Sequence, residues 1–114
     1  MERRHYRGAE QLYRALVEAD SSSELDQSYF SLAVSLAQQG KERQALKPLA
    51  DLQNRFPGSD LLPHALAVQG EIHLNLGNRG EAIKFWREFL SRFPSHPMAE
   101  RITGELKRIE SVQE

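Results

Sequence analysis

Apolar side chains recur at helical spacing along the whole chain. In residues 24–39, Tyr29, Leu32, Ala33 and Leu36 lie three or four positions apart, which places them on one face of a helix. The same spacing predicts further helices over about 2–19, 42–56, 61–76, 79–93 and 97–111. No segment alternates apolar and polar residues between turn signals, so the pattern predicts an all-α chain. The core positions expected in these other helices are Ala9, Leu12, Tyr13 and Leu16; Ala45, Leu49, Leu52 and Phe56; Ala65, Ile72 and Leu76; Ala82, Ile83, Trp86, Phe89 and Leu90; and Ala99, Ile102, Leu106 and Ile109.

Glycine and proline mark where the predicted helices end. Gly40 and Gly77 each follow a helix directly, as glycine does at the C′ position. Pro57 and Pro94 end the helices before them, because a residue that precedes proline is disfavoured from helical angles. The chain is therefore divided into helix, short turn and helix.

A few single residues modify this picture. Ser21 and Glu24 have the spacing of a capping box at the start of the helix over 24–39. Pro48 removes one backbone donor inside the helix over 42–56, so we expect a kink or a late start there. Gly104 weakens the last helix by about 1 kcal/mol relative to alanine.

The helix-turn-helix units repeat along the chain. Five positions match at an offset of 37, four with the same residue (Gly40 and Gly77, Ala45 and Ala82, Phe56 and Phe93, Pro57 and Pro94) and one with a different large residue (Leu49 and Trp86). A weaker copy lies upstream, where Ala9 and Tyr13 precede Ala45 and Leu49 by 36 positions. Such a period indicates stacked helix pairs that bury a continuous core only together.

These positions resemble the tetratricopeptide repeat family. The motif of large, small, glycine, alanine, aromatic and proline positions is carried by Tyr29, Leu32, Ala33, Leu36, Gly40, Ala45, Leu49 and Pro57, and again by Leu66, Gly70, Gly77, Ala82, Trp86 and Pro94. The resemblance implies a right-handed superhelix of about six antiparallel helices in a single domain, 1–114. It would contain a half repeat at 2–19, full repeats at 24–57 and 61–94, and a capping helix at 97–111.

The resemblance also assigns packing roles. The small residues Ala33 or Gly70, with Ala45 or Ala82, would let the helices of a pair approach closely, and Trp86 and Leu49 would fill the space between pairs. Phe89 stands where the family usually has alanine, and Gly70 would accommodate it. Gln69 replaces the usual leucine, so its surroundings are expected to be partly exposed.

The repeat length narrows the resemblance. The common unit of the family is 34 residues, whereas this one has 37, with the extra residues in FPGSDLLPHA. An aromatic-Pro-x-Ser phrase followed by Pro-x-Ala is similar to bacterial cell-envelope members of the YbgF/CpoB and BamD types. The ending RFPSHPMAERITGELKRIE is most similar to the YbgF type.

Composition and charge exclude several classes of protein. The 114 residues are 39% hydrophobic and 27% charged, with a formal net charge of −1 and no cysteine. A thiol nucleophile and a disulfide framework are thereby excluded. No apolar run is long enough for a membrane span, so no membrane insertion is expected. The start MERRHYRGAEQ lacks the apolar core of a signal peptide, so we expect a cytoplasmic protein or one whose export segment precedes this sequence.

Candidate chemistry is sparse. His64 and His73 lie nine positions apart on one predicted helix and face opposite ways, and His96 fits a turn or capping role, so no metal or other cofactor is expected. The glycines in NLGNRGEA belong to a repeat turn, and no nucleophile motif is present, so we expect no enzyme. The basic residues Arg3, Arg4, His5 and Arg7 could touch phosphate beside Tyr6, but nearby acidic residues offset them and no nucleic-acid partner is expected.

The predicted functional surface is the concave face of the superhelix, lined by the first helix of each pair. The resemblance places its partner-binding positions at Gln27, Phe30, Ser31, Val34 and Gln38 in one repeat, and at His64, Ala67, Val68, Glu71 and Asn75 in the next. His64, Val68, Glu71 and Asn75 share one helix face by spacing alone. Such a mixed stripe could hold an extended peptide of a partner protein, or it could simply be solvated. A clamp for a C-terminal carboxylate is not expected, because Phe30 and Val34 occupy its lysine and asparagine positions.

A structural role is the alternative. The helix over 2–19 looks like the second helix of a pair whose first helix is missing. Its exposed flank, with Tyr6 and Tyr13, could form the interface of a homo-oligomer. At the other end, the stripe of the helix over 97–111 can close the core while Arg101, Glu105, Lys107 and Arg108 face water.

Overall fold

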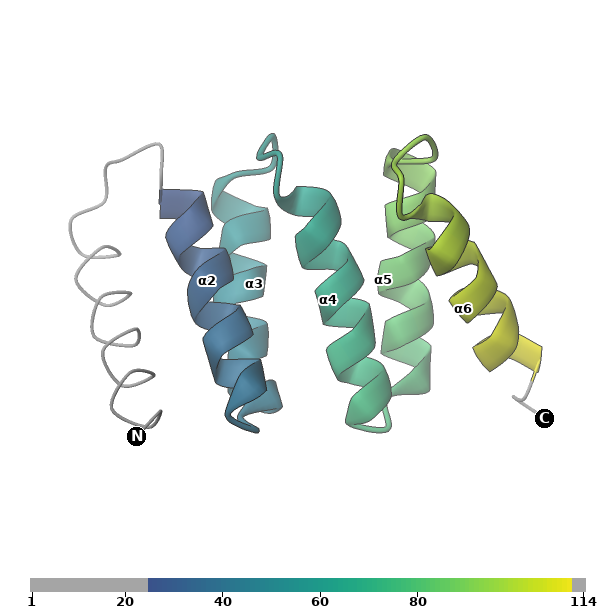
Figure 1. The fold of residues 1–114 in the computed structure, drawn as a ribbon, viewed down its shortest axis with the longest axis horizontal. Helices are drawn as coiled ribbons and strands as arrows, with labels where there is room; N and C mark the ends of the chain where they lie inside the picture. Colours follow the sequence, from purple (N-terminus) through teal and green to yellow (C-terminus); the bar gives the residue numbers. More distant parts are fainter. Residues whose placement is uncertain (1–24, 112–114) are drawn as a thin grey trace. The chain divides into compact units, whose positions relative to one another are not determined.

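The computed structural model describes residues 25–111, which form five α-helices and no β-strand (Figure 1). The helices are α2 (Leu25–Gln38), α3 (Glu42–Arg55), α4 (Leu62–Asn75), α5 (Arg79–Arg92) and α6 (Ala99–Ser111). The prediction of an all-α repeat chain is confirmed for this range. The predicted helix over 2–19, with Tyr6 and Tyr13, and the capping box of Ser21 and Glu24 lie outside the described residues.

The 37-residue period of the sequence is reproduced by the helices. The helices α2, α4 and α6 begin at Leu25, Leu62 and Ala99, and α3 and α5 begin at Glu42 and Arg79. Each start is therefore 37 positions after its equivalent. It follows that α6 is equivalent to α2 and α4, the first helices of the two pairs.

The turn inside each pair is closed by a glycine. Gly40 and Gly77 have φ of 83° and 86°, a left-handed conformation that costs glycine little. After α2, the Lys41 N–H donates to the Leu36 carbonyl at 2.8 Å, and the Gly40 N–H donates to the Ala37 carbonyl at 3.1 Å. The equivalent bonds are made after α4. This is the Schellman arrangement, and it confirms both glycines as helix stops.

The turn that joins one helix pair to the next helix also recurs, and we call this turn the seam (residues 56–61 and 93–98). Phe56 and Phe93 cap α3 and α5, each followed by its proline. The Ser59 hydroxyl accepts the backbone N–H of Leu61 at 3.0 Å. Nδ1 of His96, 37 positions later, accepts the N–H of Met98 at 3.1 Å. A serine and a histidine thus close the same turn, and the predicted turn role of His96 is confirmed.

The contacts of the chain divide it into two compact units on either side of the Leu62–Pro63 bond. In the first unit, α2 and α3 pack side by side as an antiparallel pair (Figure 1). All four predicted core residues of α2 are buried, and Ala45, Leu49 and Leu52 of α3 are fully buried. Burying apolar side chains on both helices is the main source of stability for such a pair.

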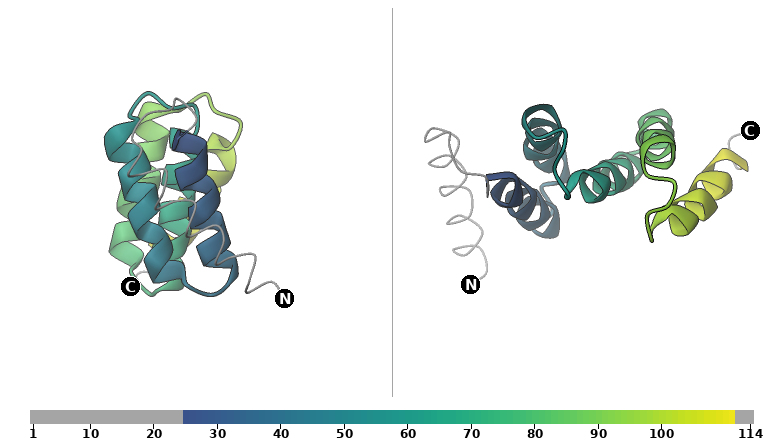
Figure 2. Two further views of the ribbon diagram at one scale, coloured as in Figure 1. Left: turned by 90° about the vertical axis from the view of Figure 1, so that its left-hand side faces the viewer. Right: turned by 90° about the horizontal axis from the view of Figure 1, so that it is seen from above.

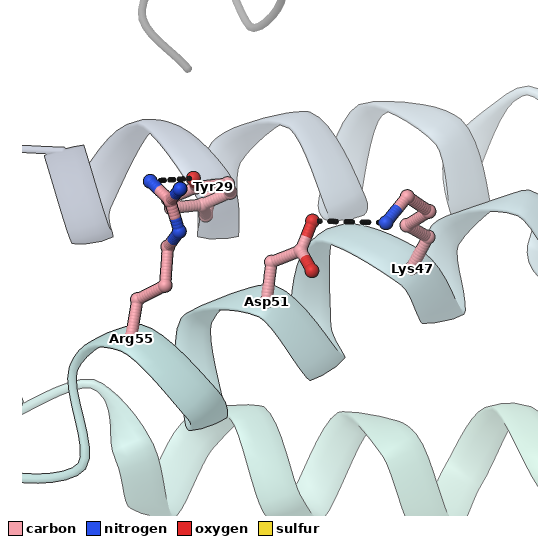
Figure 3. A network of polar contacts seen from close by, with 4 residues as sticks. All are labelled: Tyr29, Lys47, Asp51 and Arg55. Atoms are coloured by element: carbon pink, nitrogen blue, oxygen red, sulfur yellow. Dashed lines mark hydrogen bonds and ion pairs between the residues drawn. The ribbon is translucent and has the colours of Figure 1, made fainter. Parts of the chain in front are cut away.

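Polar contacts fasten the end of α3 to α2. Arg55 donates to the Tyr29 hydroxyl at 3.1 Å, as Figure 3 shows, and the Tyr29 ring lies 5.9 Å from the Phe56 ring. The Ser59 hydroxyl donates to the Asp26 carboxylate at 2.6 Å. Because these contacts join both ends of the seam to α2, they fix the path of the chain out of the pair. The Lys47–Asp51 ion pair in the same figure lies within α3 and contributes only tenths of a kcal/mol.

The second unit contains α4, α5 and α6. Seen from above, α4 and α6 form one layer and α5 stands behind them (Figure 2, right). The Trp86 indole on α5 donates to the Ala67 carbonyl on α4 at 3.1 Å. Arg87 on α5 forms an ion pair with Glu110 on α6. The α6 stripe of Ala99, Ile102, Leu106 and Ile109 is buried, which confirms these four residues as core positions of this unit.

Gly70 is a point of close approach between α4 and α5. A Cβ atom on Gly70 would lie 2.2 Å from Nε1 of Trp86. Gly70 therefore makes room for Trp86, whereas the sequence predicts that Gly70 accommodates Phe89. The Phe89 ring instead meets Phe93 at 5.9 Å and His96 at 5.6 Å. Trp86 packs within its own pair, so the expected role between pairs describes only part of its surroundings.

Some expected details are wrong. The helix α3 begins at Glu42 and continues through Pro48, so the late start is wrong, while the alternative of a kink at Pro48 stays a prediction. Pro48 is buried within the helix, where its missing donor is offset by burial of its ring. Several predicted core residues are only half-buried, namely Phe56, Leu76, Ile83 and Leu90. These residues lie near helix ends or at the edges of their apolar stripes.

Gln69 is the clearest departure from expectation. It was expected to be partly exposed, but its side chain is 3% exposed, and its Oε1 has no hydrogen-bond partner among the described residues. The position is buried because it lies on the inner side of α4, beside Ala65 and Ile72, as the usual leucine would. A buried acceptor without a partner is destabilising.

Replacing Gln69 with leucine is expected to raise the free energy of unfolding by about 1–2 kcal/mol, because it removes the unpaired amide oxygen and keeps a similar side-chain volume. Urea denaturation of the full chain measures this change. The matched control is Gln38→Leu on exposed α2 surface, which should stay within about 0.5 kcal/mol of the parent. A loss of stability in Gln69→Leu would contradict the assignment of Gln69 as an unsatisfied core residue.

Candidate functional site

The second unit contains a cavity of about 350 Å³, which we call the α4–α6 cavity. The helices α4 and α6 form its walls, and Trp86 of α5 contributes to its lining. Its lining residues are His64, Ala67, Val68, Glu71, Leu74, Asn75, Trp86, Met98, Arg101, Ile102, Glu105 and Arg108. The volume lies at the lower end of the range for ligand pockets, so the cavity would hold a short stretch of a peptide.

The predicted positions of the second repeat come together here. His64, Val68, Glu71 and Asn75 all line the α4–α6 cavity, together with Ala67. They do so because the i+4 and i+7 spacing keeps them on one face of α4, while Ala65 and Ile72 turn inward. The helix thus has a buried stripe and a separate stripe that faces the cavity.

The sequence did not lead us to predict that α6 lines the α4–α6 cavity. Arg101, Glu105 and Arg108 were expected only to face water, and they also line the α4–α6 cavity. They follow His64, Val68 and Glu71 by 37 positions. The repeat period could therefore have identified them, because α6 begins a third repeat and presents the same face as α4. Lys107, which has no such equivalent, does not line the cavity.

The charges in the cavity are unevenly paired. Arg108 forms an ion pair with Glu105 on its own helix. Glu71 of α4 and Arg101 of α6 are both exposed and form no hydrogen bond or ion pair within residues 25–111. Two opposite charges without partners among the described residues therefore stand on opposite walls of one cavity, whose remaining lining is a mixture of polar and apolar side chains.

The three histidines within residues 25–111 are not part of a metal-ligand cluster. The His64 ring meets the His96 ring edge-on at 5.5 Å, but His96 already uses Nδ1 in its turn. His73 stacks on Phe85 at 5.4 Å between α4 and α5. Within residues 25–111, no group of three or more His, Asp or Glu residues could hold a metal ion. The rings instead act as packing and turn residues.

The predicted positions on α2 belong to the first unit. Gln27, Ser31 and Gln38 are exposed on α2, whereas Phe30 and Val34 are half-buried. Their role in partner binding stays a prediction. Tyr6 and Tyr13, the predicted oligomer surface, and the basic residues Arg3, Arg4, His5 and Arg7 lie outside the described residues. In the described part of the chain, none of the helices has the length and apolar character that crossing a membrane requires.

Comparison with known families agrees with this architecture. The tetratricopeptide repeat model matches residues 27–59 and 68–96, which together make up more than half of the chain. The chain therefore belongs to the tetratricopeptide repeat family. No curated protein and no solved structure gave a significant match. Members of this family are generally protein–protein interaction modules and are generally not catalytic.

Proposed function

We propose that this protein is a non-catalytic adaptor that binds a peptide segment of a partner protein in the α4–α6 cavity. The observation that carries the proposal is the convergence of two equivalent helix faces on one cavity. Polar groups suited to hydrogen bonding, such as Asn75 and Glu71, surround the apolar Val68 and Trp86. This combination suits an extended chain, whose backbone needs hydrogen bonds and whose side chains need apolar contact.

The proposal also includes the cellular complex in which the adaptor works. The 37-residue unit and the phrase FPGSDLLPHA are similar to envelope members of the family. On that ground we propose that the adaptor works in a bacterial envelope complex. The extra residues support a specific seam, since Ser59 within the phrase bonds both Asp26 and the Leu61 N–H.

Loss of two cavity groups should weaken partner capture. The double variant Glu71→Ala, Asn75→Ala is expected to weaken partner binding about thirtyfold and to lower the yield of captured partner accordingly, because two hydrogen bonds of about 1 kcal/mol each are lost. Cross-linking of the purified full chain in lysate, followed by mass spectrometry, measures the yield. The melting temperature of the variant should stay close to that of the parent.

The matched control is Lys84→Ala, because Lys84 is exposed on α5 and does not line the cavity. This variant should capture the partner as the parent does. If the double variant also captured partner normally, the cavity would not be the binding site. The tetratricopeptide fold would be unaffected by that result.

A further inference from the structure

The charges of Arg101 and Glu71 in the α4–α6 cavity lie at different positions along the axes of α6 and α4. The helices α4 and α6 run in the same general direction (Figure 1). Arg101 lies in the first turn of α6, and its equivalent on α4 is His64. Glu71 lies seven residues further along α4 than His64, which corresponds to a rise of about 10 Å.

The two ends of the cavity therefore differ in charge. One end has Arg101 and His64 beside the N-terminus of α6, where the helix dipole also favours an anion. The other end has Glu71 and Arg108, and because Arg108 forms an ion pair with Glu105, the Glu71 charge is left uncompensated. Between these ends lie the apolar side chains of Val68, Trp86 and Ile102.

We infer that the cavity accepts a peptide segment in which an acidic and a basic residue flank an apolar side chain. The acidic residue pairs with Arg101, the apolar side chain fills the centre, and the basic residue pairs with Glu71. An extended peptide rises about 3.3 Å per residue, so the two charged residues should lie about three to four positions apart. This inference rests on the proposed function and specifies the chemistry of the partner.

Charge complementarity favours this occupant over one of a single sign. A purely acidic segment would bring a like charge next to Glu71, and a purely basic segment would bring a like charge next to Arg101. Each would therefore be repelled at one end of the cavity. An uncharged segment would cover both charges without a partner, which is costly when they lose water. Only a segment that carries both an acidic and a basic residue pairs with Arg101 and Glu71 at the same time.

The test is a selection of random dodecapeptides displayed on phage against the full chain. The selected peptides should share an acidic residue, an apolar residue and a basic residue in the predicted spacing. A synthetic copy of the most frequent peptide should bind Arg101→Glu about tenfold more weakly than the parent, since a charge-assisted bond is replaced by repulsion. Repeating the selection on Arg101→Glu should replace the acidic residue by a basic one.

The matched control is Arg43→Glu, which makes the same change of charge on an exposed site of α3 in the other unit. It should select the same peptides as the parent and bind them equally well. Nuclear magnetic resonance shifts locate the bound peptide on the parent chain. Selected peptides that shift α4 and α6 resonances but carry no shared charges would overturn the inference and leave the proposed function standing.

Two other kinds of result would overturn both the inference about the peptide's charges and the proposed function. The first is the absence of any selected peptide, or peptides that shift only resonances outside the α4–α6 cavity. The second is sedimentation of the chain as a dimer whose contact covers Glu71 and Arg101, which would assign the cavity to a second copy of this chain.

Discussion

Replacing Gly70 with alanine is expected to lower the free energy of unfolding by about 1–3 kcal/mol, as overpacking of a filled core does. The new Cβ would lie 2.2 Å from Nε1 and 2.4 Å from Cδ1 of Trp86. The indole cannot easily move away, because it is buried and its N–H is bonded to the Ala67 carbonyl. Urea denaturation of the full chain measures the change.

Gly104 provides the matched control for Gly70. It also lies within a helix of the second unit, but a Cβ there would meet nothing within 4 Å. Gly104→Ala should therefore raise the free energy of unfolding by about 1 kcal/mol, the usual gain of alanine over glycine in a helix. The two substitutions are chemically identical and should have opposite signs. A stabilising Gly70→Ala would show that the approach of α4 and α5 at this point is not close.

Replacing Trp86 with alanine is expected to have the largest effect, a loss of about 3–5 kcal/mol in the free energy of unfolding. The side chain is 4% exposed, fills the space over Gly70 and contributes to the lining of the α4–α6 cavity. Its removal leaves a void between α4 and α5 that the glycine cannot fill. Thermal or urea denaturation measures this loss, and peptide binding should be lost with it.

Trp86→Phe separates packing from the indole hydrogen bond. Phenylalanine keeps an aromatic ring but has no N–H for the Ala67 carbonyl, so the expected loss is about 1–2 kcal/mol. The smaller ring should also reduce the cost of Gly70→Ala, so the two substitutions should be non-additive in a double-mutant cycle. Additive effects would contradict the direct contact between Gly70 and Trp86.

Much of the fold is predictable because the repeat is encoded in local signals. The glycine stops, the proline stops and the apolar spacing each depend on neighbours in sequence, and Gly40, Gly77, Pro57 and Pro94 all act as predicted. Expectations based on the family consensus were less accurate where two helices meet. The contact of Gly70 with Trp86 and the burial of Gln69 depend on packing between helices, which no local pattern reports.

Half of the cavity was predictable from sequence. The α4 face followed from helical spacing, which places His64, Val68 and Glu71 together. The α6 face was missed because its charged residues are typical of a solvated capping helix. Applying the 37-residue period to α6 would have placed Arg101 opposite the α4 residues. The ion pair of Arg108, which leaves Arg101 and Glu71 unpaired, required the positions of the side chains.

We propose that this protein binds its partner in the α4–α6 cavity. The most direct measurement is the change in ¹H–¹⁵N chemical shifts of the labelled full chain when a selected peptide is added. We predict that the largest changes fall on Val68, Glu71, Arg101 and Glu105 and on the Trp86 indole N–H, with small changes in α3. Changes confined to α2 and α3, with the cavity residues unmoved, would contradict the claim.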